Sequence, residues 1–135
     1  MPEFRLHHVA VALREIEPAL GLYRDALGGR DLGGGEEPGR GDGGWRWRQV
    51  EYPGRGRIEM LEPHGEGFLT RFLRSRGEGL HHLTFRTDDL RSAVDRLRRA
   101  GYELVDVDLE DPRWKEAFLR PSSAHGTLIQ LAEID

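Results

Sequence analysis

The sequence contains no cysteine and only one lysine, Lys115. Without cysteine, disulfides, thiolate nucleophiles and Cys-ligated zinc or iron-sulfur sites are excluded. The formal net charge of −4 shows no excess of basic residues that would indicate nucleic-acid binding. The chain has no apolar run as long as a membrane span, and no basic leader followed by an apolar core at its N-terminus. We therefore expect a cytoplasmic protein that binds neither nucleic acid nor a membrane.

The length of 135 residues favours a single domain. Hydrophobic residues make up 37% of the chain and charged residues 33%, which is typical of a globular protein. A chain of this size can bury roughly two thirds of its unfolded surface, so it needs no metal or disulfide to fold. Any bound metal would therefore serve chemistry.

An internal repeat is the most informative feature of the sequence. Residues 6–29 and 80–103 align at a constant offset of 74 residues. Six positions are identical in the two copies: Leu6/Leu80, His7/His81, His8/His82, Ala19/Ala93, Arg24/Arg98 and Ala26/Ala100. Two copies of one supersecondary unit, each too small to fold well alone, are expected to pair about a pseudo-two-fold axis.

The hydrophobic periodicity predicts the same order of elements in each copy. A β-branched or aromatic run comes first, an amphipathic helix follows, and further strands complete the copy. The predicted strands are residues 6–13, 45–52, 57–62, 80–87, 103–108, 115–120 and 126–133. The stretch 28–44, with nine glycines in seventeen positions, is predicted to be a loop.

The expected fold is α+β, with two tandem βαβββ modules related by pseudo-two-fold symmetry. Together they would form a curved mixed sheet with a metal cleft. Module one is expected at about 4–63 and module two at about 78–135, joined by a linker helix at about 66–77, within one domain spanning 1–135.

Strand alternation selects four polar residues for this cleft. Because neighbouring strand residues face opposite sides, His8 and His82 point away from the bulky apolar face that the helices must cover. Glu59 and Gln130 alternate in the same way with apolar residues near the end of each module. Two imidazoles, a carboxylate and an amide oxygen suit a divalent transition metal with open positions. The same alternation predicts that His7 and His81 lie on the packed face as structural histidines.

Several phrases of the sequence resemble a known superfamily. They are LHHVAVAL, LYRDALGG, IEMLEP, FLTRFLRSRGEGLHHLTFRTDDL and FLRPSSAHGTLIQL. They are similar to the vicinal oxygen chelate superfamily, which includes glyoxalase I, extradiol dioxygenases, fosfomycin and bleomycin resistance proteins and methylmalonyl-CoA epimerase, and most of all to the epimerases. The resemblance implies metal ligands at His8, Glu59, His82 and Gln130, with Co, Ni, Zn, Mn or Fe as the cation. We also expect a homodimer.

Gln130 departs from the pattern of the resembled enzymes, which have glutamate at this position. That carboxylate is implied to bind the metal and, in the epimerases, to move a proton. An amide can offer its oxygen to a metal, but it cannot accept a proton at neutral pH. Glu59 is therefore the expected catalytic group, and Glu116 and Glu51 are the candidates for a second base. Three arginines, Arg46, Arg48 and Arg86, could hold an anionic substrate.

The leading hypothesis is a metal-dependent isomerase or lyase similar to methylmalonyl-CoA epimerase. It would act on a small molecule such as an acyl-CoA thioester, stabilise an enolate on the cation and shuttle a proton with Glu59. A glyoxalase I-like lactoylglutathione lyase would use the same chemistry. An Fe(II) dioxygenase is a further alternative, because His8, His82 and Glu59 form a two-His, one-carboxylate set. A non-catalytic binding or resistance protein is the alternative that the Gln130 departure favours.

Overall fold

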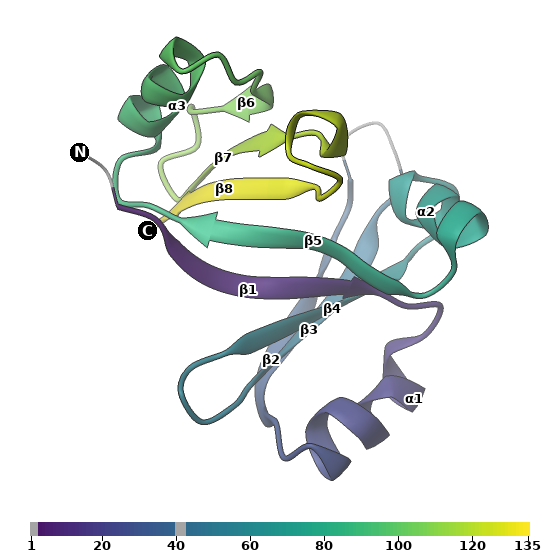
Figure 1. The fold of residues 1–135 in the computed structure, drawn as a ribbon. Helices are drawn as coiled ribbons and strands as arrows, with labels where there is room; N and C mark the ends of the chain where they lie inside the picture. The colour runs from purple at the N-terminus through teal and green to yellow at the C-terminus, as the bar shows by residue number, and fades with distance from the viewer. Residues whose placement is uncertain (1–2, 40–42) are drawn as a thin grey trace. The chain divides into compact units, whose positions relative to one another are not determined.

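The computed structural model describes residues 3–39 and 43–135. Its elements follow the order β1 (Arg5–Ala12), α1 (Ile16–Leu20), the π-helix η1 (Gly21–Ala26), β2 (Arg30–Glu37), β3 (Trp45–Glu51), β4 (Arg57–Pro63), α2 (Phe68–Arg76), β5 (Gly79–Arg86), α3 (Leu90–Arg99), β6 (Val105–Asp108), β7 (Trp114–Leu119), the 3-10 helix η2 (Pro121–Ser123) and β8 (Ile129–Ile134) (Figure 1). A strand, a helix and three strands therefore occur twice, which confirms the predicted α+β class and the βαβββ modules. None of the helices in the described ranges is long and apolar enough to cross a membrane.

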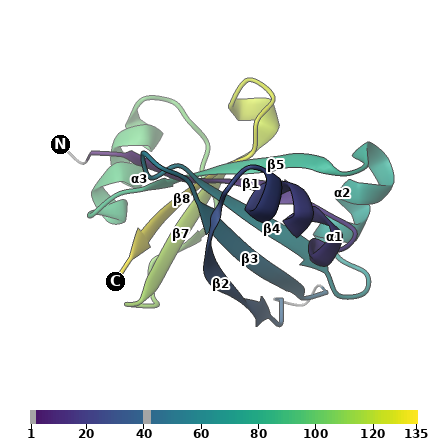
Figure 2. The ribbon, with the colours of Figure 1, turned by 90° about the horizontal axis from the view of Figure 1, so that it is seen from below.

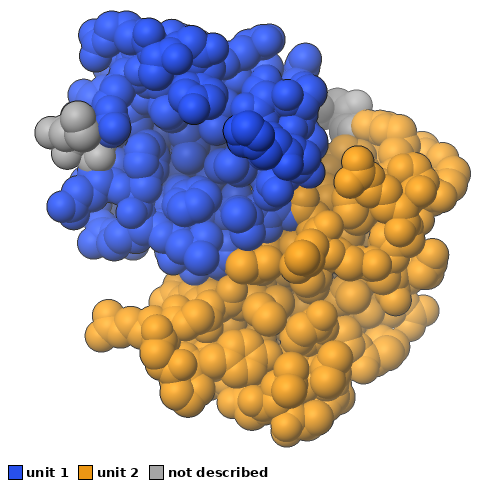
Figure 3. All heavy atoms as spheres, in the orientation of Figure 1, with its two compact units in different colours: residues 1–8, 82–135 blue, residues 9–81 orange. Residues whose placement is uncertain are grey.

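The chain divides into two compact units (Figure 3). One unit contains residues 9–81, and the other contains residues 1–8 together with 82–135. The division falls within β1, between His8 and Val9, and within β5, between His81 and His82.

The 9–81 unit has the strand order β2-β3-β4-β1. Here β1 and β4 are parallel, whereas β4, β3 and β2 are successively antiparallel (Figure 2). One face of these strands packs against α1 through the cluster Val11, Leu13, Ile16, Leu20, Val50 and Met60. The other face packs against α2 through Ala10, Ala12, Leu61, Leu69 and Leu73. Strand alternation produces both clusters, since neighbouring residues such as Met60 and Leu61 point to opposite faces.

The unit of residues 1–8 and 82–135 repeats this order as β5-β8-β7-β6. Strands β5 and β8 are parallel, and the remaining pairs are antiparallel. Asp89 is the N-cap residue of helix α3, and its side chain accepts a hydrogen bond from the Ser92 amide (3.1 Å). The apolar side of the helix packs on one face of the strands through Leu90, Ala93, Val94, Leu104, Ala117, Leu119 and Leu131. The opposite face carries Thr84, Glu116 and Gln130, which are joined by hydrogen bonds.

The prediction of a loop at 28–44 is wrong for residues 30–37, which form β2. The glycines fit a strand here because β3 approaches very closely. A Cβ atom on Gly34 would lie 2.1 Å from the Trp47 carbonyl oxygen, and one on Gly35 would lie 3.1 Å from the Trp47 Nε1. Glycine therefore permits this contact where any side chain would force the strands apart. Residues 40–42 of the predicted loop lie outside the described residues.

We expect the core under α3 to carry much of the stability of its unit. Leu90 is 0% exposed, whereas Leu80 is 73% exposed. Leu90→Ala should lower the free energy of unfolding by about 2–5 kcal/mol, because it leaves a cavity in the core. Leu80→Ala, the matched control, should change it by less than about 0.5 kcal/mol. Urea denaturation of both variants measures the difference, and equal losses would contradict the assignment of this core.

Candidate metal centre

The structure brings the two predicted histidines together. His8 lies on β1 and His82 on β5, and both belong to the unit of residues 1–8 and 82–135. Their ring centroids are 5.9 Å apart with an interplanar angle of 68°. His8 is only 3% exposed. The spacing leaves both imidazoles able to direct a ring nitrogen at one ion.

Glu59 lies on β4, in the 9–81 unit. In the parallel ladder it is the partner of Ala10, which follows His8 by two residues on β1 and so shares its face of the strand. Gln49 Nε2 donates a hydrogen bond to Glu59 Oε2 (2.7 Å). Burial raises the pKa of the Glu59 carboxyl, the Gln49 hydrogen bond opposes this shift, and the nearby charge of Glu37 adds to it. A cation beside Glu59 would favour the ionised form and reverse the effect of burial.

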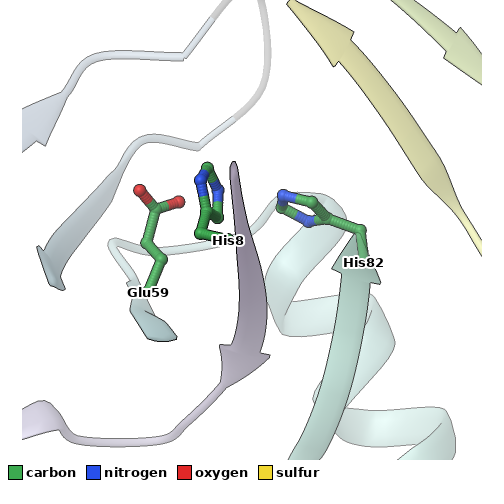
Figure 4. A group of neighbouring side chains, drawn as sticks. All are labelled: His8, Glu59 and His82. Carbon is green, nitrogen blue, oxygen red and sulfur yellow. The ribbon is translucent and has the colours of Figure 1, made fainter. Parts of the chain in front are cut away.

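His8, Glu59 and His82 each offer one ligand atom, and these atoms lie within 4.8 Å of one another (Figure 4). Bonds of about 2.0–2.2 Å to a transition metal put two ligand atoms of one ion roughly 3–4 Å apart. Two imidazoles and a carboxylate are also the donor types that such ions accept. The three residues therefore have the donor types of a divalent transition metal site, and atoms separated by up to 4.8 Å would draw together to the shorter spacing when an ion binds.

Gln130, the fourth predicted ligand, is 9% exposed and already takes part in two hydrogen bonds. Its Oε1 accepts from Thr84 Oγ1 (2.7 Å), and its Nε2 donates to Glu116 Oε1 (3.0 Å). Thr84 is the partner of Gln130 in the parallel ladder and follows His82 by two residues on β5. An amide oxygen has two lone pairs, so the bond from Thr84 leaves one for a metal. The role of Gln130 as a ligand stays a prediction.

His81 lies against aromatic rings, in keeping with its interpretation as a structural histidine. Its ring centroid is 5.7 Å from that of Phe68 and 4.8 Å from that of Phe72, both on α2. Burial lowers the pKa of His81 to about 4, so the imidazole is neutral at physiological pH.

His7 is closer to the candidate site than strand alternation predicts. Its Nδ1 lies 2.8 Å from the Nδ1 of His8, and their ring centroids are 5.1 Å apart. Both Nδ1 atoms are near the backbone, so the side chains of these neighbouring residues can meet beside the strand. A histidine that binds metal through Nε2 carries its proton on Nδ1 and can donate it to such a partner. His7 is therefore in a position to orient His8.

The two candidates for a second base have different surroundings. Glu51 accepts hydrogen bonds from Arg30 (2.7 Å) and Arg57 (2.9 Å), which lower the pKa of its carboxyl and make it a poor base. Glu116 instead accepts hydrogen bonds from Trp114 Nε1 (2.7 Å) and from Gln130. Only Glu116 thus contacts a predicted site residue.

The three arginines suggested for substrate binding are engaged in interactions within the protein. Arg46 Nη1 is 3.1 Å from Glu62 Oε2, and Arg48 pairs with Asp31 through two of its nitrogens. Arg86 Nη2 donates to the Ile134 carbonyl (2.9 Å). Arg46 and Arg48 also line a hollow over β2 and β3 of the 9–81 unit, so an anion there would have to compete with both carboxylates.

Residues 7–118 match the family described as the Glyoxalase/Bleomycin resistance protein/Dioxygenase superfamily. The chain belongs to this superfamily. Among its relatives is an ethylmalonyl-CoA/methylmalonyl-CoA epimerase of Cereibacter sphaeroides, 31% identical over 96% of this chain and 98% of the relative. A mitochondrial methylmalonyl-CoA epimerase of Mus musculus is 30% identical over 96% of this chain and 72% of the relative.

Solved structures agree with this membership. The methylmalonyl-CoA epimerase of Mycobacterium tuberculosis has a TM-score of 0.81 and 30% identity, covering 96% of this chain and 87% of its own. A hypothetical protein of Bacillus halodurans has a TM-score of 0.87 and 28% identity, covering 98% and 96%. The expected resemblance to the vicinal oxygen chelate fold and its epimerases is thereby confirmed.

Gln49, the partner of Glu59, was not predicted from the sequence. The signal was present in the hairpin that joins β3 and β4 around the Pro53–Gly56 turn. Antiparallel pairing about that turn sets Gln49 opposite Glu59, as the register shows. A hairpin register read from the turn would therefore have found this contact.

The buried His81 predicts a pH dependence of stability. The unfolded chain binds a proton at the ordinary histidine pKa of 6.5, whereas the folded chain binds it only near pH 4. Stability should therefore be complete above pH 6.5 and fall as the pH drops toward 4, by at most about 3 kcal/mol from this group. His81→Leu should flatten the curve of unfolding free energy against pH over this range in metal-free protein.

Phe72→Leu serves as the control for this experiment. It weakens the same packing contact without removing a titrating group, so it should lower stability at every pH and keep the slope. If His81→Leu kept the slope as well, another group would be responsible for it.

Proposed function

We propose that this chain is a metal-dependent epimerase that acts on an acyl-CoA thioester with an acidic α-C–H, such as methylmalonyl-CoA. The observation that carries the proposal is the group of His8, Glu59 and His82. It occurs in a chain that aligns over 96% of its length with methylmalonyl-CoA epimerases at about 30% identity. The substrate named for those relatives is the most direct indication of the substrate class.

In this proposal His8, His82 and Glu59 hold a divalent transition metal, with the Gln130 amide oxygen as the fourth donor. When bound, the cation would draw electron density from a substrate carbonyl and make the neighbouring C–H more acidic. The candidate donors leave room in the coordination sphere of a six-coordinate ion for a substrate that offers two oxygens.

Glu59 is the proposed proton acceptor. Gln49 donates a hydrogen bond to its Oε2 and so holds the carboxylate by one of its oxygens. The hydrogen bond also fixes the carboxylate plane, which reduces the reorganisation needed when the proton is transferred. A base positioned in this way contributes about 10²–10⁴ to the rate of proton transfer.

An Fe(II) dioxygenase is the second candidate function. The observation that favours it is the donor set itself, because two histidines and one carboxylate make up the site of many non-haem iron oxygenases. A glyoxalase-type lyase would share the proton transfer by Glu59, and a non-catalytic binding protein would bind ligand without turnover. These functions differ in the reaction that the protein would catalyse.

The metal site predicts a difference between neighbouring histidines. Protein purified without chelator should contain roughly one transition metal ion per chain, and His82→Leu should lose it because affinity depends on the complete ligand set. His81→Leu, one residue away, should retain it, since this ring packs against α2. Elemental analysis of both variants measures the outcome. Full metal content in a His8→Ala, His82→Ala double variant would show that these histidines do not bind the metal.

The proposed base predicts exchange of a substrate proton with solvent. The protein should incorporate deuterium from heavy water at the α-carbon of methylmalonyl-CoA, as followed by mass spectrometry. Glu59→Gln should slow this exchange by about 10²–10⁴-fold. The exposed Glu110→Gln is the matched control and should leave the rate unchanged.

The absence of proton exchange would argue for a different function. If neither acyl-CoA thioesters nor hemithioacetals exchange with the wild-type protein, and Gln130→Glu creates no exchange, the isomerase proposal is wrong. Oxygen consumption with a catechol and Fe(II) would then support the dioxygenase.

A further inference from the structure

A chain of hydrogen bonds crosses three strands of the unit of residues 1–8 and 82–135. Thr84 on β5 donates to the Gln130 oxygen on β8, and the Gln130 nitrogen donates to Glu116 on β7. Trp114 Nε1 donates to the same Glu116 oxygen (2.7 Å). Thr84 is 0% exposed. These groups lie on the face of the strands opposite α3, which is the face of His82.

The orientation of the Gln130 amide depends on Glu116. A threonine hydroxyl can donate or accept, so Thr84 alone would tolerate either end of the amide. An ionised carboxylate can only accept, so Glu116 must receive the NH2 group. The amide oxygen is consequently turned away from β7 and toward β5, the strand that carries His82.

The 9–81 unit contains the same kind of pair with the strands exchanged. There the carboxylate, Glu59, lies on the strand parallel to β1, and the amide, Gln49, lies on the neighbouring antiparallel strand. In the other unit the amide, Gln130, lies on the strand parallel to β5, and the carboxylate, Glu116, is on its antiparallel neighbour. Each unit thus joins one carboxylate to one amide across two neighbouring antiparallel strands.

We propose that Glu116 is a positioning residue for the metal site. It holds the Gln130 amide with its oxygen directed toward the side of His82, and it supplies next to Gln130 the negative charge that a glutamate at 130 would have carried. The inference rests on the proposed function, because it takes Gln130 as a metal ligand. Groups that orient a ligand in this way typically contribute about 10–100-fold to metal affinity.

Binding of Co²⁺ tests the proposal, because its visible spectrum reports the ligand set as well as the affinity. Glu116→Gln should weaken Co²⁺ binding by about 10–100-fold, since the substituted amide can accept or donate and no longer fixes Gln130. Glu103→Gln, an exposed glutamate of the same unit, is the matched control and should bind as the wild type does. Urea denaturation in the presence of chelator checks that both variants fold.

Two further variants separate a positioning role from a merely structural one. In a Gln130→Ala background, Glu116→Gln should cause no additional loss of Co²⁺ affinity, because the amide that it orients is gone. The double variant Glu116→Gln, Gln130→Glu should recover wild-type Co²⁺ affinity or exceed it. It places the carboxylate on the strand parallel to β5 and the amide on the neighbouring antiparallel strand, as in the 9–81 unit.

The outcomes distinguish this inference from the proposed function. If His82→Leu abolishes Co²⁺ binding while Glu116→Gln and Gln130→Ala leave it unchanged, the metal site stands and the role of Glu116 is wrong. If Gln130→Ala weakens binding but Glu116→Gln does not, Gln130 is a ligand that Glu116 does not position. If the wild-type protein binds no Co²⁺, both proposals fail.

Discussion

The parallel pairing of each module's last strand with its first strand is the interaction on which the candidate site depends. The ladder between β1 and β4 sets Glu59 beside Ala10, and the ladder between β5 and β8 sets Gln130 beside Thr84. Parallel strands need a long crossover, so these neighbours come from opposite ends of a module. Because side chains alternate with a period of two, a slip of one residue would send both polar side chains into the apolar clusters under the helices. The apolar residues on either side of them therefore protect the register of the site.

Much of the fold and of the site could be predicted from the sequence because the deciding patterns are local. The repeat, together with the alternation of apolar and polar residues, indicated the βαβββ order and the faces of His8 and His82. The strand β2 could not be predicted in this way. Its glycines carry no hydrophobic pattern, and the reason they form a strand lies in Trp47 on the neighbouring strand.

The hydrogen-bond partners of the site residues could not be predicted from the pattern of a single strand either. The contact between His7 and His8 depends on the positions of ring atoms close to the backbone, which strand alternation does not describe. The bond from Gln130 to Glu116 depends on the register of β7 and β8, whose connection contains the 3-10 helix η2. The second of these contacts follows from pairing between strands, which the pattern of a single strand does not determine.

Strand β2 lies at the end of the strand order, so one of its edges has no partner strand within the described residues. Its register with β3 shifts between Asp31 and Gly33, and the Asp31 carboxylate accepts a hydrogen bond from the Gly33 amide (2.8 Å). The strand ends in two acidic residues, Glu36 and Glu37. A bulge, an amide occupied by a side chain and paired like charges all oppose the addition of a foreign strand. These three features act against edge-to-edge aggregation at a strand whose glycines offer no side chains to block it.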